Sequence, residues 1–346
     1  MKSSEQQSRV AWIDYAKGLS IILVVNMHST LGVEASMETT SFAGEIVTFA
    51  GAFRMPLFFM IAGLFLYRSI DESWMKFLDK KLVHFAYFYF LWSLIQFGVK
   101  YPISAGNHDV TLNTLLLTPI EPFGTIWFIY VLATFFLATR ILKKAHPALL
   151  ISGAVILKLL PIETGWMVID SFASQYIFFI IGYLGSAHIL KLADQAKNYP
   201  LLVLFGSAVF AIWNVAMMKL GWTHDPAFGA VAGVSGSLAI IALCAVLAKY
   251  DVLSFIRTIG KHSLYIFLAF FAPMAITRIV LIKTGFIPEI NTFAFLVTAI
   301  SVATPLLGYL IVRNTPLDFL IKRPQWCKLK QSKNVTTANL SLAVDR

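Results

Sequence analysis

Ten apolar stretches, most of them near 20 residues long, constrain the fold of this chain more than any other feature. A helix of about 20 apolar residues spans the hydrocarbon core of a bilayer, and helices satisfy their backbone polar groups internally there. The stretches are residues 13–33, 46–67, 82–101, 125–141, 147–161, 172–190, 200–218, 227–248, 262–282 and 293–312. The sequence therefore predicts an all-α polytopic membrane protein, a bundle of about ten transmembrane helices over residues 1–312, with a basic tail over 313–346.

The composition supports a membrane protein. The chain is 58% hydrophobic and only 13% charged, whereas soluble domains carry about a quarter charged residues. Cys244 and Cys327 give no disulfide or metal framework, and no HExxH, Walker or Rossmann pattern is present. We therefore expect neither a metal nor a bound cofactor, and expect any chemistry to come from a few polar groups lining a membrane cavity.

The basic residues predict the orientation of the chain. The net charge of +10 is spread in short clusters between the apolar stretches, which argues for membrane topology rather than nucleic-acid binding. If the N-terminus is cytoplasmic, 22 of the 28 Lys and Arg residues fall in cytoplasmic segments. The outer segments then hold Lys100, Lys158, Lys219 and Lys283, and the spans hold Arg54 and Arg278. This asymmetry predicts that both termini are cytoplasmic.

The first stretch carries Asp14, Lys17 and His28 on one helical stripe. Lys17 and His28 are separated by three helical turns, roughly 16 Å along the axis. Ionisable groups inside a membrane are costly and mark functional sites by default. The purely structural alternatives are that Asp14 and Lys17 neutralise each other as an i, i+3 pair, and that a neighbouring helix satisfies the hydrogen-bonding groups of His28. The stripe predicts a site that reaches from one membrane surface toward the other.

The second stretch places Arg54 inside the membrane, two residues before Pro56. Proline frees a backbone carbonyl and disfavours a helical conformation at Met55, so we expect a local opening of the helix. Arg54 facing a neutral His28 suits an acyl carbonyl, with His28 handling the proton and Arg54 stabilising the oxyanion. The structural alternative is an arginine that caps a broken helix.

A basic patch precedes the third span. It consists of Lys76, Lys80, Lys81 and His84, and residues 261–263 form a similar cluster before the ninth span. Lipid headgroups are the usual partner of such a patch, and a nucleotide phosphate is the more specific alternative.

Three further features lie near the outer surface. Glu121 and Trp127 flank the outer start of the fourth span, where aromatic belts occur. Arg278 can snorkel to the interface and receives no role. The small residues Gly229, Gly233, Gly236 and Ser237 of the eighth span predict a close helix-packing face.

Five segments follow one another along nearly the whole chain: RVAWIDYAKGLSIILVVNMH (9–28), FRMPLFFMIAGLFLYRS (53–69), TIWFIYVLAT (125–134), FFIIGYLGS (178–186) and IGKHSLYIFL (259–268). They resemble the acyltransferase-3 family of membrane proteins, and within it the sugar O-acetyltransferase branch described as fucose 4-O-acetylase-like. The resemblance implies a ten-helix bundle that transfers an acyl group, usually acetyl from acetyl-CoA, to an extracytoplasmic glycan or lipid-linked sugar.

The resemblance also assigns residues. His28 matches the family's essential histidine, Lys17 the basic residue eleven positions earlier, which is commonly arginine, and Arg54 the arginine of the FRxPLFF motif. Two departures are visible. The RxxR-type motif before the third span is reduced to Lys81 and His84, and Phe270 and Phe271 stand where a histidine often follows SLYIFL.

Together these observations predict a bacterial inner-membrane O-acyltransferase that uses acyl-CoA as donor. Lys17, with Asp14 beside it, and Lys80 or Lys81 would meet the donor's phosphates, and the thioester would extend to His28. His28 would either deprotonate the acceptor hydroxyl or carry the acyl group itself. Arg54 would hold the acyl oxygen.

On the acceptor side, the outer loops around Glu121 and Trp127 would hold the sugar, and membrane lipids would surround the bundle. Two other functions stay open at this stage. A transporter or flippase for a glycan or small solute would use His28, Arg54 and the acidic outer loops as a pathway or proton relay. An inactive accessory or sensor protein is kept open by Phe270.

Overall fold

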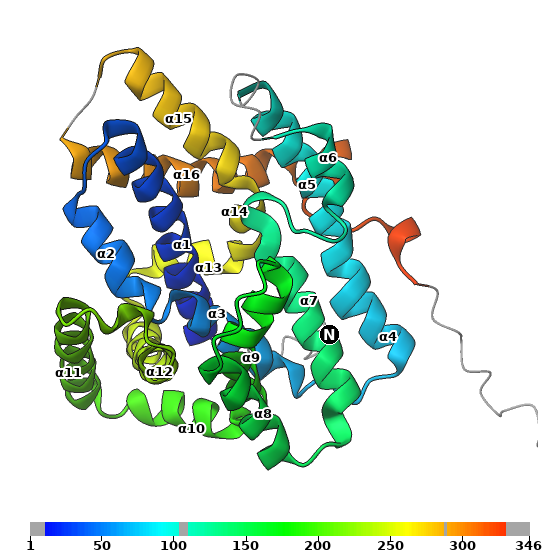
Figure 1. Ribbon diagram of the computed structural model, residues 1–346, viewed down its shortest axis with the longest axis vertical. Coiled ribbons are helices and arrows are strands. Elements are labelled where there is room, and N and C mark those ends of the chain that lie inside the picture. The colour runs from blue at the N-terminus through cyan, green and yellow to red at the C-terminus, as the bar shows by residue number, and fades with distance from the viewer. Residues whose placement is uncertain (1–10, 104–109, 287–288, 330–346) are drawn as a thin grey trace, which may run out of the picture.

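The structure is a computed structural model and describes residues 11–103, 110–286 and 289–329. All regular secondary structure in these ranges is helical, and the helices form one bundle (Figure 1). The α-helices are α1 (Ala11–Met37), α2 (Phe42–Gly51), α3 (Arg54–Leu66), α4 (Trp74–Leu78), α5 (His84–Ile103), α6 (Leu112–Leu117), α7 (Trp127–Ile141), α8 (Pro147–Leu159), α9 (Met167–Leu184), α10 (Ser186–Ala196), α11 (Pro200–Lys219), α12 (Pro226–Tyr250), α13 (Ser254–Lys261), α14 (Ser263–Ala269), α15 (Phe271–Lys283) and α16 (Ile290–Val312).

Within the described residues, eight helical segments are long and apolar enough to cross a membrane. They comprise α1, α2 with α3, α4 with α5, α7 with its short flanking turns, α9, α11, α12 and α16. The helix pair α14–α15 passes the same test as one segment bent by 50°. Helix α8 has only 13 residues, about 20 Å, which is shorter than the hydrocarbon core. The multi-pass all-α architecture is thus confirmed, whereas the count of about ten spans stays a prediction.

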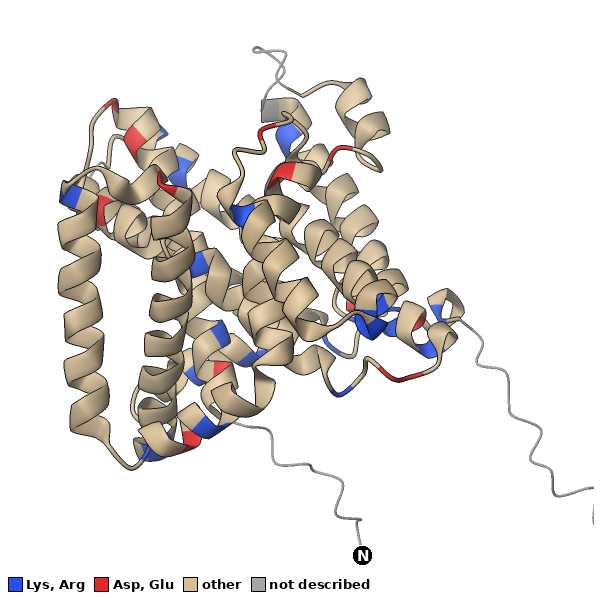
Figure 2. Cartoon of the chain, turned by 60° about the horizontal axis from the view of Figure 1, so that its bottom comes forward, with Lys and Arg blue, Asp and Glu red and all other residues tan. Residues whose placement is uncertain are grey.

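The two ends of the bundle differ in charge. We call the end at which α1 begins the near face and the opposite end the far face. Figure 2 shows the Lys and Arg positions gathered mainly at the near face, whereas the far face mixes basic and acidic positions.

The second span is interrupted where Arg54 begins α3. Helix α2 ends at Gly51, and Phe53 has φ −126° and ψ −12°, outside the helical region. The expectation that Met55 leaves the helix is wrong, because Met55 and Pro56 lie in the first turn of α3. Proline is tolerated there because the first-turn N–H groups have no intrahelical acceptor. The break therefore falls before Arg54, which is the first residue of α3.

Helix α1 crosses α13 at very short range because both helices carry glycine at the crossing. A Cβ on Gly18 would overlap the carbonyl oxygen of Ile256, and a Cβ on Gly260 would overlap that of Asp14. Only residues without side chains permit such an approach. The predicted packing face of α12 is confirmed at Gly233, where a Cβ would meet the ring of Phe178 at 2.5 Å.

The described part of the C-terminal tail folds back onto α4 and α5. The hydroxyl of Tyr87 donates to the carbonyl of Phe319 at 2.9 Å. Arg323 pairs with Asp79 at 2.6 Å, and the Leu329 N–H donates to the same carboxylate. Residues 313–329 therefore support the near-face end of the α4–α5 segment, and residues 330–346 lie outside the described ranges.

Candidate active site

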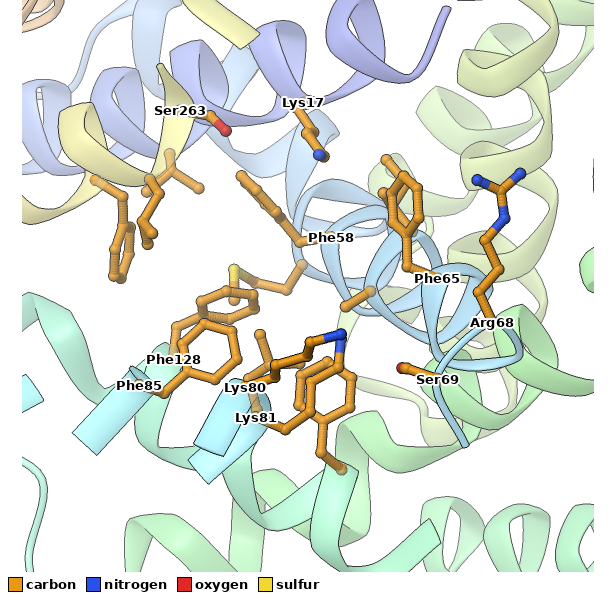
Figure 3. A pocket seen from close by; sticks show the side chains of 18 residues that line it. Lys17, Phe58, Phe65, Arg68, Ser69, Lys80, Lys81, Phe85, Phe128 and Ser263 are labelled. Atoms are coloured by element: carbon orange, nitrogen blue, oxygen red, sulfur yellow. The ribbon is translucent and has the colours of Figure 1, made fainter. Parts of the chain in front are cut away.

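A cavity of about 540 Å³ opens between α1, α3, the α4–α5 segment, α7 and α14 (Figure 3). Its wall is mostly apolar, and these side chains are Val24, Met55, Phe58, Ile61, Ala62, Phe65, Phe85, Phe128, Leu132, Phe136, Leu264 and Phe267. Two serines, Ser69 and Ser263, complete the lining together with four basic residues.

Basic side chains from three separate segments meet at this cavity. Lys17 comes from α1, Arg68 from the turn after α3, and Lys80 and Lys81 from the start of the α4–α5 segment. Figure 3 shows Lys17 on one side of the cavity and Lys80 and Lys81 on the other. The Lys17 ammonium lies 4.9 Å from the ring centre of Phe65. The cavity therefore brings Lys17 together with Lys80 and Lys81, whereas Lys76 and His84 of the same patch do not line it.

A widened helical turn carries the two patch lysines. Residues Asp79–Val83 form a single π-helical turn between α4 and α5, and such bulges occur frequently at functional sites. The ammonium of Lys81 lies 4.4 Å from the ring centre of Phe136. Lys80 pairs with Glu72 at 2.7 Å.

Glu72 lies in the turn that precedes α4, at the near face. Burial raises the pKa of this carboxyl, whereas hydrogen bonds from Lys80 and Lys76 and the charges of these lysines lower it. The lowering effects together are larger, so the pKa of Glu72 lies below its usual value. Glu72 is thus ionised at neutral pH and offsets part of the positive charge at the cavity mouth.

His28 lies just beyond the inner end of the cavity. Val24 lines the cavity and stands one helical turn, about 6 Å, before His28 on α1. The imidazole packs against Phe270 with ring centres 5.5 Å apart, and Phe270 contacts the cavity residue Phe267 at 6.5 Å. No residue of the described ranges forms a hydrogen bond with His28. Its nitrogens are therefore available to a substrate that reaches the inner end.

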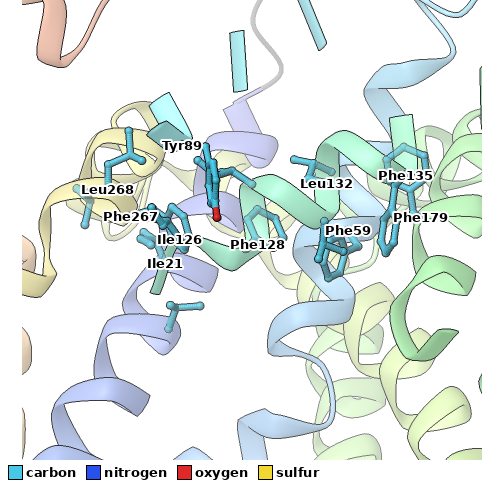
Figure 4. Close-up of a cluster of buried hydrophobic side chains, with 14 of the residues drawn as sticks. Ile21, Phe59, Tyr89, Ile126, Phe128, Leu132, Phe135, Phe179, Phe267 and Leu268 are labelled. Carbon is cyan, nitrogen blue, oxygen red and sulfur yellow. The ribbon is translucent and has the colours of Figure 1, made fainter. Parts of the chain in front are cut away.

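The inner wall continues directly into the aromatic core of the bundle (Figure 4). Phe128 lines the cavity and contacts Phe59 at 4.8 Å between ring centres and Phe267 at 5.6 Å. Phe59 in turn packs on Phe135 at 4.8 Å. Interlocked rings on three helices thus fix the width of the cavity at its inner end.

The guanidinium of Arg54 sits against the turn of α1 that carries His28. Arg54 is only 8% exposed and donates to the sulfur of Met27 at 2.7 Å and to the carbonyl of Val47 at 3.3 Å. Its Nε has no partner among the described residues. The positive charges that act on His28 through space are those of Arg54 and Lys100. Arg54 therefore joins the carbonyl of Val47 in α2 to Met27, the residue that precedes His28 in α1.

Three residues predicted for the substrate site do not line this cavity. Asp14 is 2% exposed and lies at the crossing of α1 with α13. Glu121 is exposed, and Trp127 is half-buried, with its ring edge-on to Phe128 at 6.4 Å.

The sequence reasoning missed Arg68 and Lys100. Arg68 is the last residue but one of the FRMPLFFMIAGLFLYRS segment, and the sequence alone marks it only as a loop charge. Lys100 was counted as an outer-loop residue, but its ammonium lies 4.7 Å from the ring centres of both Phe123 and Phe271. Its position at the polar end of an apolar helix gave no signal that would separate it from a topology charge.

In the part of the chain that the structure describes, no three His, Cys, Asp or Glu side chains converge on one point. The groups suited to a ligand are the four basic residues of the cavity, which match phosphate, and the apolar wall, which matches an uncharged chain.

Comparison with known proteins decides the family. The family model described as Acyltransferase domain matches residues 10–313, which include every residue that lines the cavity. The chain belongs to the acyltransferase-3 family. No curated protein and no solved structure gave a match. As an acyltransferase-3 protein, the chain is a membrane acyltransferase, and the cavity with His28 and Arg54 lies wholly inside the acyltransferase domain.

Proposed function

We propose that this acyltransferase-3 protein is an O-acyltransferase of the fucose 4-O-acetylase-like branch. It moves an acetyl or other short acyl group from acyl-CoA to a hydroxyl of an extracytoplasmic glycan or lipid-linked sugar, in the inner membrane of a bacterium. One observation carries the proposal: an apolar cavity with four cations runs inward to a point one helical turn from His28.

The cavity matches acyl-CoA in polarity. Arg68, Lys80 and Lys81 provide donors for the phosphates of the nucleotide, and charge-assisted hydrogen bonds to phosphate are among the stronger ones. The apolar wall between Phe58 and Phe128 suits the uncharged pantetheine arm. The thioester carbonyl then lies at the inner end, near His28.

Acyl transfer at this point requires a base and an oxyanion donor. In one route His28 removes the proton of the acceptor hydroxyl, the oxygen attacks the thioester carbonyl, and the C–S bond breaks to release CoA as a thiol. In the other route His28 attacks the thioester carbonyl first, and the C–S bond breaks to release CoA as a thiol. The acceptor hydroxyl then attacks the acyl-imidazole, the C–N bond breaks, and the proton of the hydroxyl passes to the imidazole. In both routes we assign stabilisation of the developing oxyanion to the guanidinium of Arg54, which is held at Met27 beside His28.

The charge distribution supports the orientation. The near face carries the cavity cations and most of the Lys and Arg positions of the described residues (Figure 2). By the positive-inside tendency this is the cytoplasmic face, where acyl-CoA is present. His28 and the far face then meet the extracytoplasmic acceptor.

The test is thermal unfolding of the purified protein in detergent with acetyl-CoA. A ligand that binds only the native state raises the melting temperature. Ala62 lines the cavity, so the larger side chain in Ala62→Phe should fill part of the cavity and abolish the rise in melting temperature with acetyl-CoA. The matched control is Ala133→Phe, because Ala133 lines a groove between α5 and α7 that shares only Phe85 with the donor cavity. No shift in the wild type, or an unchanged shift in Ala62→Phe, would refute the donor site.

A further inference from the structure

A second cavity, of about 280 Å³, flanks the break between α2 and α3. Pro56 lines it, whereas the adjacent residue Met55 lines the donor cavity. The two cavities therefore lie on different sides of the same helix start, where Arg54 directly precedes Met55 in the chain. Residues of α8, α9, α11 and α12 close the second cavity.

Two amide oxygens in this cavity lack hydrogen-bond donors. Asn214 is fully buried, and its Nδ2 donates to the carbonyl of Phe49 at 3.0 Å. Its Oδ1 and the Oε1 of Gln175 are buried, and neither has a partner in the described part of the chain. Buried acceptors without donors cost free energy, on the order of 1–3 kcal/mol each. A molecule in the cavity that donates hydrogen bonds would satisfy these two oxygens.

One cation and aromatic rings complete the chemistry. The ammonium of Lys158 lies 5.9 Å from the ring centre of Phe178 and forms no ion pair within the described ranges. Phe178 and Phe228 both line the cavity. The protein offers amide oxygens as acceptors, an ammonium group as a donor and aromatic rings as packing surfaces. A ligand that matches all three carries several hydroxyls on a ring with an apolar face. Sugars have this character, because each hydroxyl both donates and accepts while the C–H face packs on an aromatic ring.

A groove connects the cavity to the far face. The groove lies between α2 and α11, has a volume of about 650 Å³ and shares Thr48, Met218 and Thr223 with the cavity. Charged residues at its margin are Glu45 and Lys219. If one sugar unit of a glycan occupies the cavity, the rest of the glycan chain can extend along this groove to the far face.

We infer that the cavity at the α2–α3 break binds one sugar residue of a glycan whose chain extends along the α2–α11 groove. The binding of a sugar unit is inferred from the lining of the cavity alone. Its use as the anchor for a non-reacting part of the acceptor rests on the proposed function, because the same break carries Arg54. Holding the glycan here would tie acceptor binding to the segment that presents this arginine near His28.

The experiment measures oligosaccharide binding to the full chain in detergent by calorimetry and thermal unfolding. The probes are neutral glucan, amino-sugar and uronic-acid oligosaccharides. Gln175→Leu removes one unpartnered oxygen. Gly229→Leu fills the cavity, since the nearest atom to a Cβ there is the flexible Lys158 ammonium at 3.5 Å. Lys191→Met, on the exposed surface of α10, is the control.

At least one probe should raise the melting temperature of the wild type and of Lys191→Met. Both cavity variants should weaken the dissociation constant of that probe at least tenfold and keep the stabilisation by acetyl-CoA. The inference is overturned if none of the three probes stabilises the wild type, or if both cavity variants bind as the wild type does. Loss of the acetyl-CoA effect in the wild type would refute the donor site and leave the sugar site standing.

Discussion

The imidazole of His28 packs on the ring of Phe270, with centres 5.5 Å apart and planes inclined by 35°. Phe270 is fully buried and stands at the 50° bend between α14 and α15. The resemblance to the acyltransferase-3 family implies a histidine after SLYIFL, where this chain has Phe270 and Phe271. In this chain, the group that borders His28 at the bend is therefore a hydrocarbon ring, which orients the imidazole by packing and supplies no proton.

Shortening Phe270 should loosen His28 without affecting donor binding. Because Phe270 does not line the donor cavity, Phe270→Ala should leave the KM for acetyl-CoA unchanged. The kcat should fall by about 10–100-fold, since small misplacement of a catalytic group has effects of this size. Steady-state CoA release measures both constants. Phe270→Leu, which keeps more of the packing, should retain an intermediate kcat, and a wild-type kcat in Phe270→Ala would contradict the orienting role.

Arg54 should be required for chemistry as well as for the helix cap. Arg54→Lys keeps the charge but loses the forked geometry that reaches Met27 and Val47 together. We expect kcat to fall about 10²-fold or more, as when an oxyanion donor is removed. The thermal shift with acetyl-CoA should persist. If this variant lowers only the melting temperature and leaves kcat intact, the arginine is a structural cap.

The patch lysines should contribute affinity for the nucleotide end of the donor. Lys81→Met should weaken acetyl-CoA binding about tenfold or more, because a charged hydrogen bond is worth about 1.5–3 kcal/mol. Lys191→Met removes an exposed lysine of the same length away from the cavity and should have no effect. Acetyl-pantetheine lacks the nucleotide phosphates, so its turnover should be equal in the two variants. Calorimetry and CoA release give these values, and equal acetyl-CoA affinity in both variants would exclude a phosphate contact.

The crossing of α1 and α13 should tolerate no side chain. In Gly260→Val, the Cβ meets the backbone of Asp14, so the helices must separate and the melting temperature should drop by several degrees. Gly153→Ala is the matched control, because a Cβ there meets no atom within 4 Å. This variant should be neutral or slightly more stable, since alanine favours helix over glycine by about 1 kcal/mol. Equal melting temperatures would show that the crossing adapts freely.

The sequence predicted the features that depend on local pattern. The apolar stretches gave the helices because hydropathy over about 20 residues reports burial in a bilayer. The three-turn spacing of Lys17 and His28 predicted a site along α1, and the structure shows Lys17 on the cavity wall and His28 one turn beyond its inner end.

Features that depend on packing between distant segments escaped the sequence reasoning. The break before Arg54 falls at Phe53 because α2 and α3 pack on different neighbours, and the proline rule alone placed it at Met55. Lys100 stands between two rings contributed by other segments, and no local pattern reports that. The α2–α3 cavity likewise needs Gln175 and Asn214 from separate helices.

The most direct test of the account is the release of CoA from acetyl-CoA by purified protein in detergent, compared between the wild type and His28→Ala. His28 has no hydrogen-bond partner in the described residues, so the variant should fold normally and bind acetyl-CoA as the wild type does. The account predicts CoA release by the wild type and a fall to background in His28→Ala. Release at the wild-type rate in the variant would contradict the central role of His28.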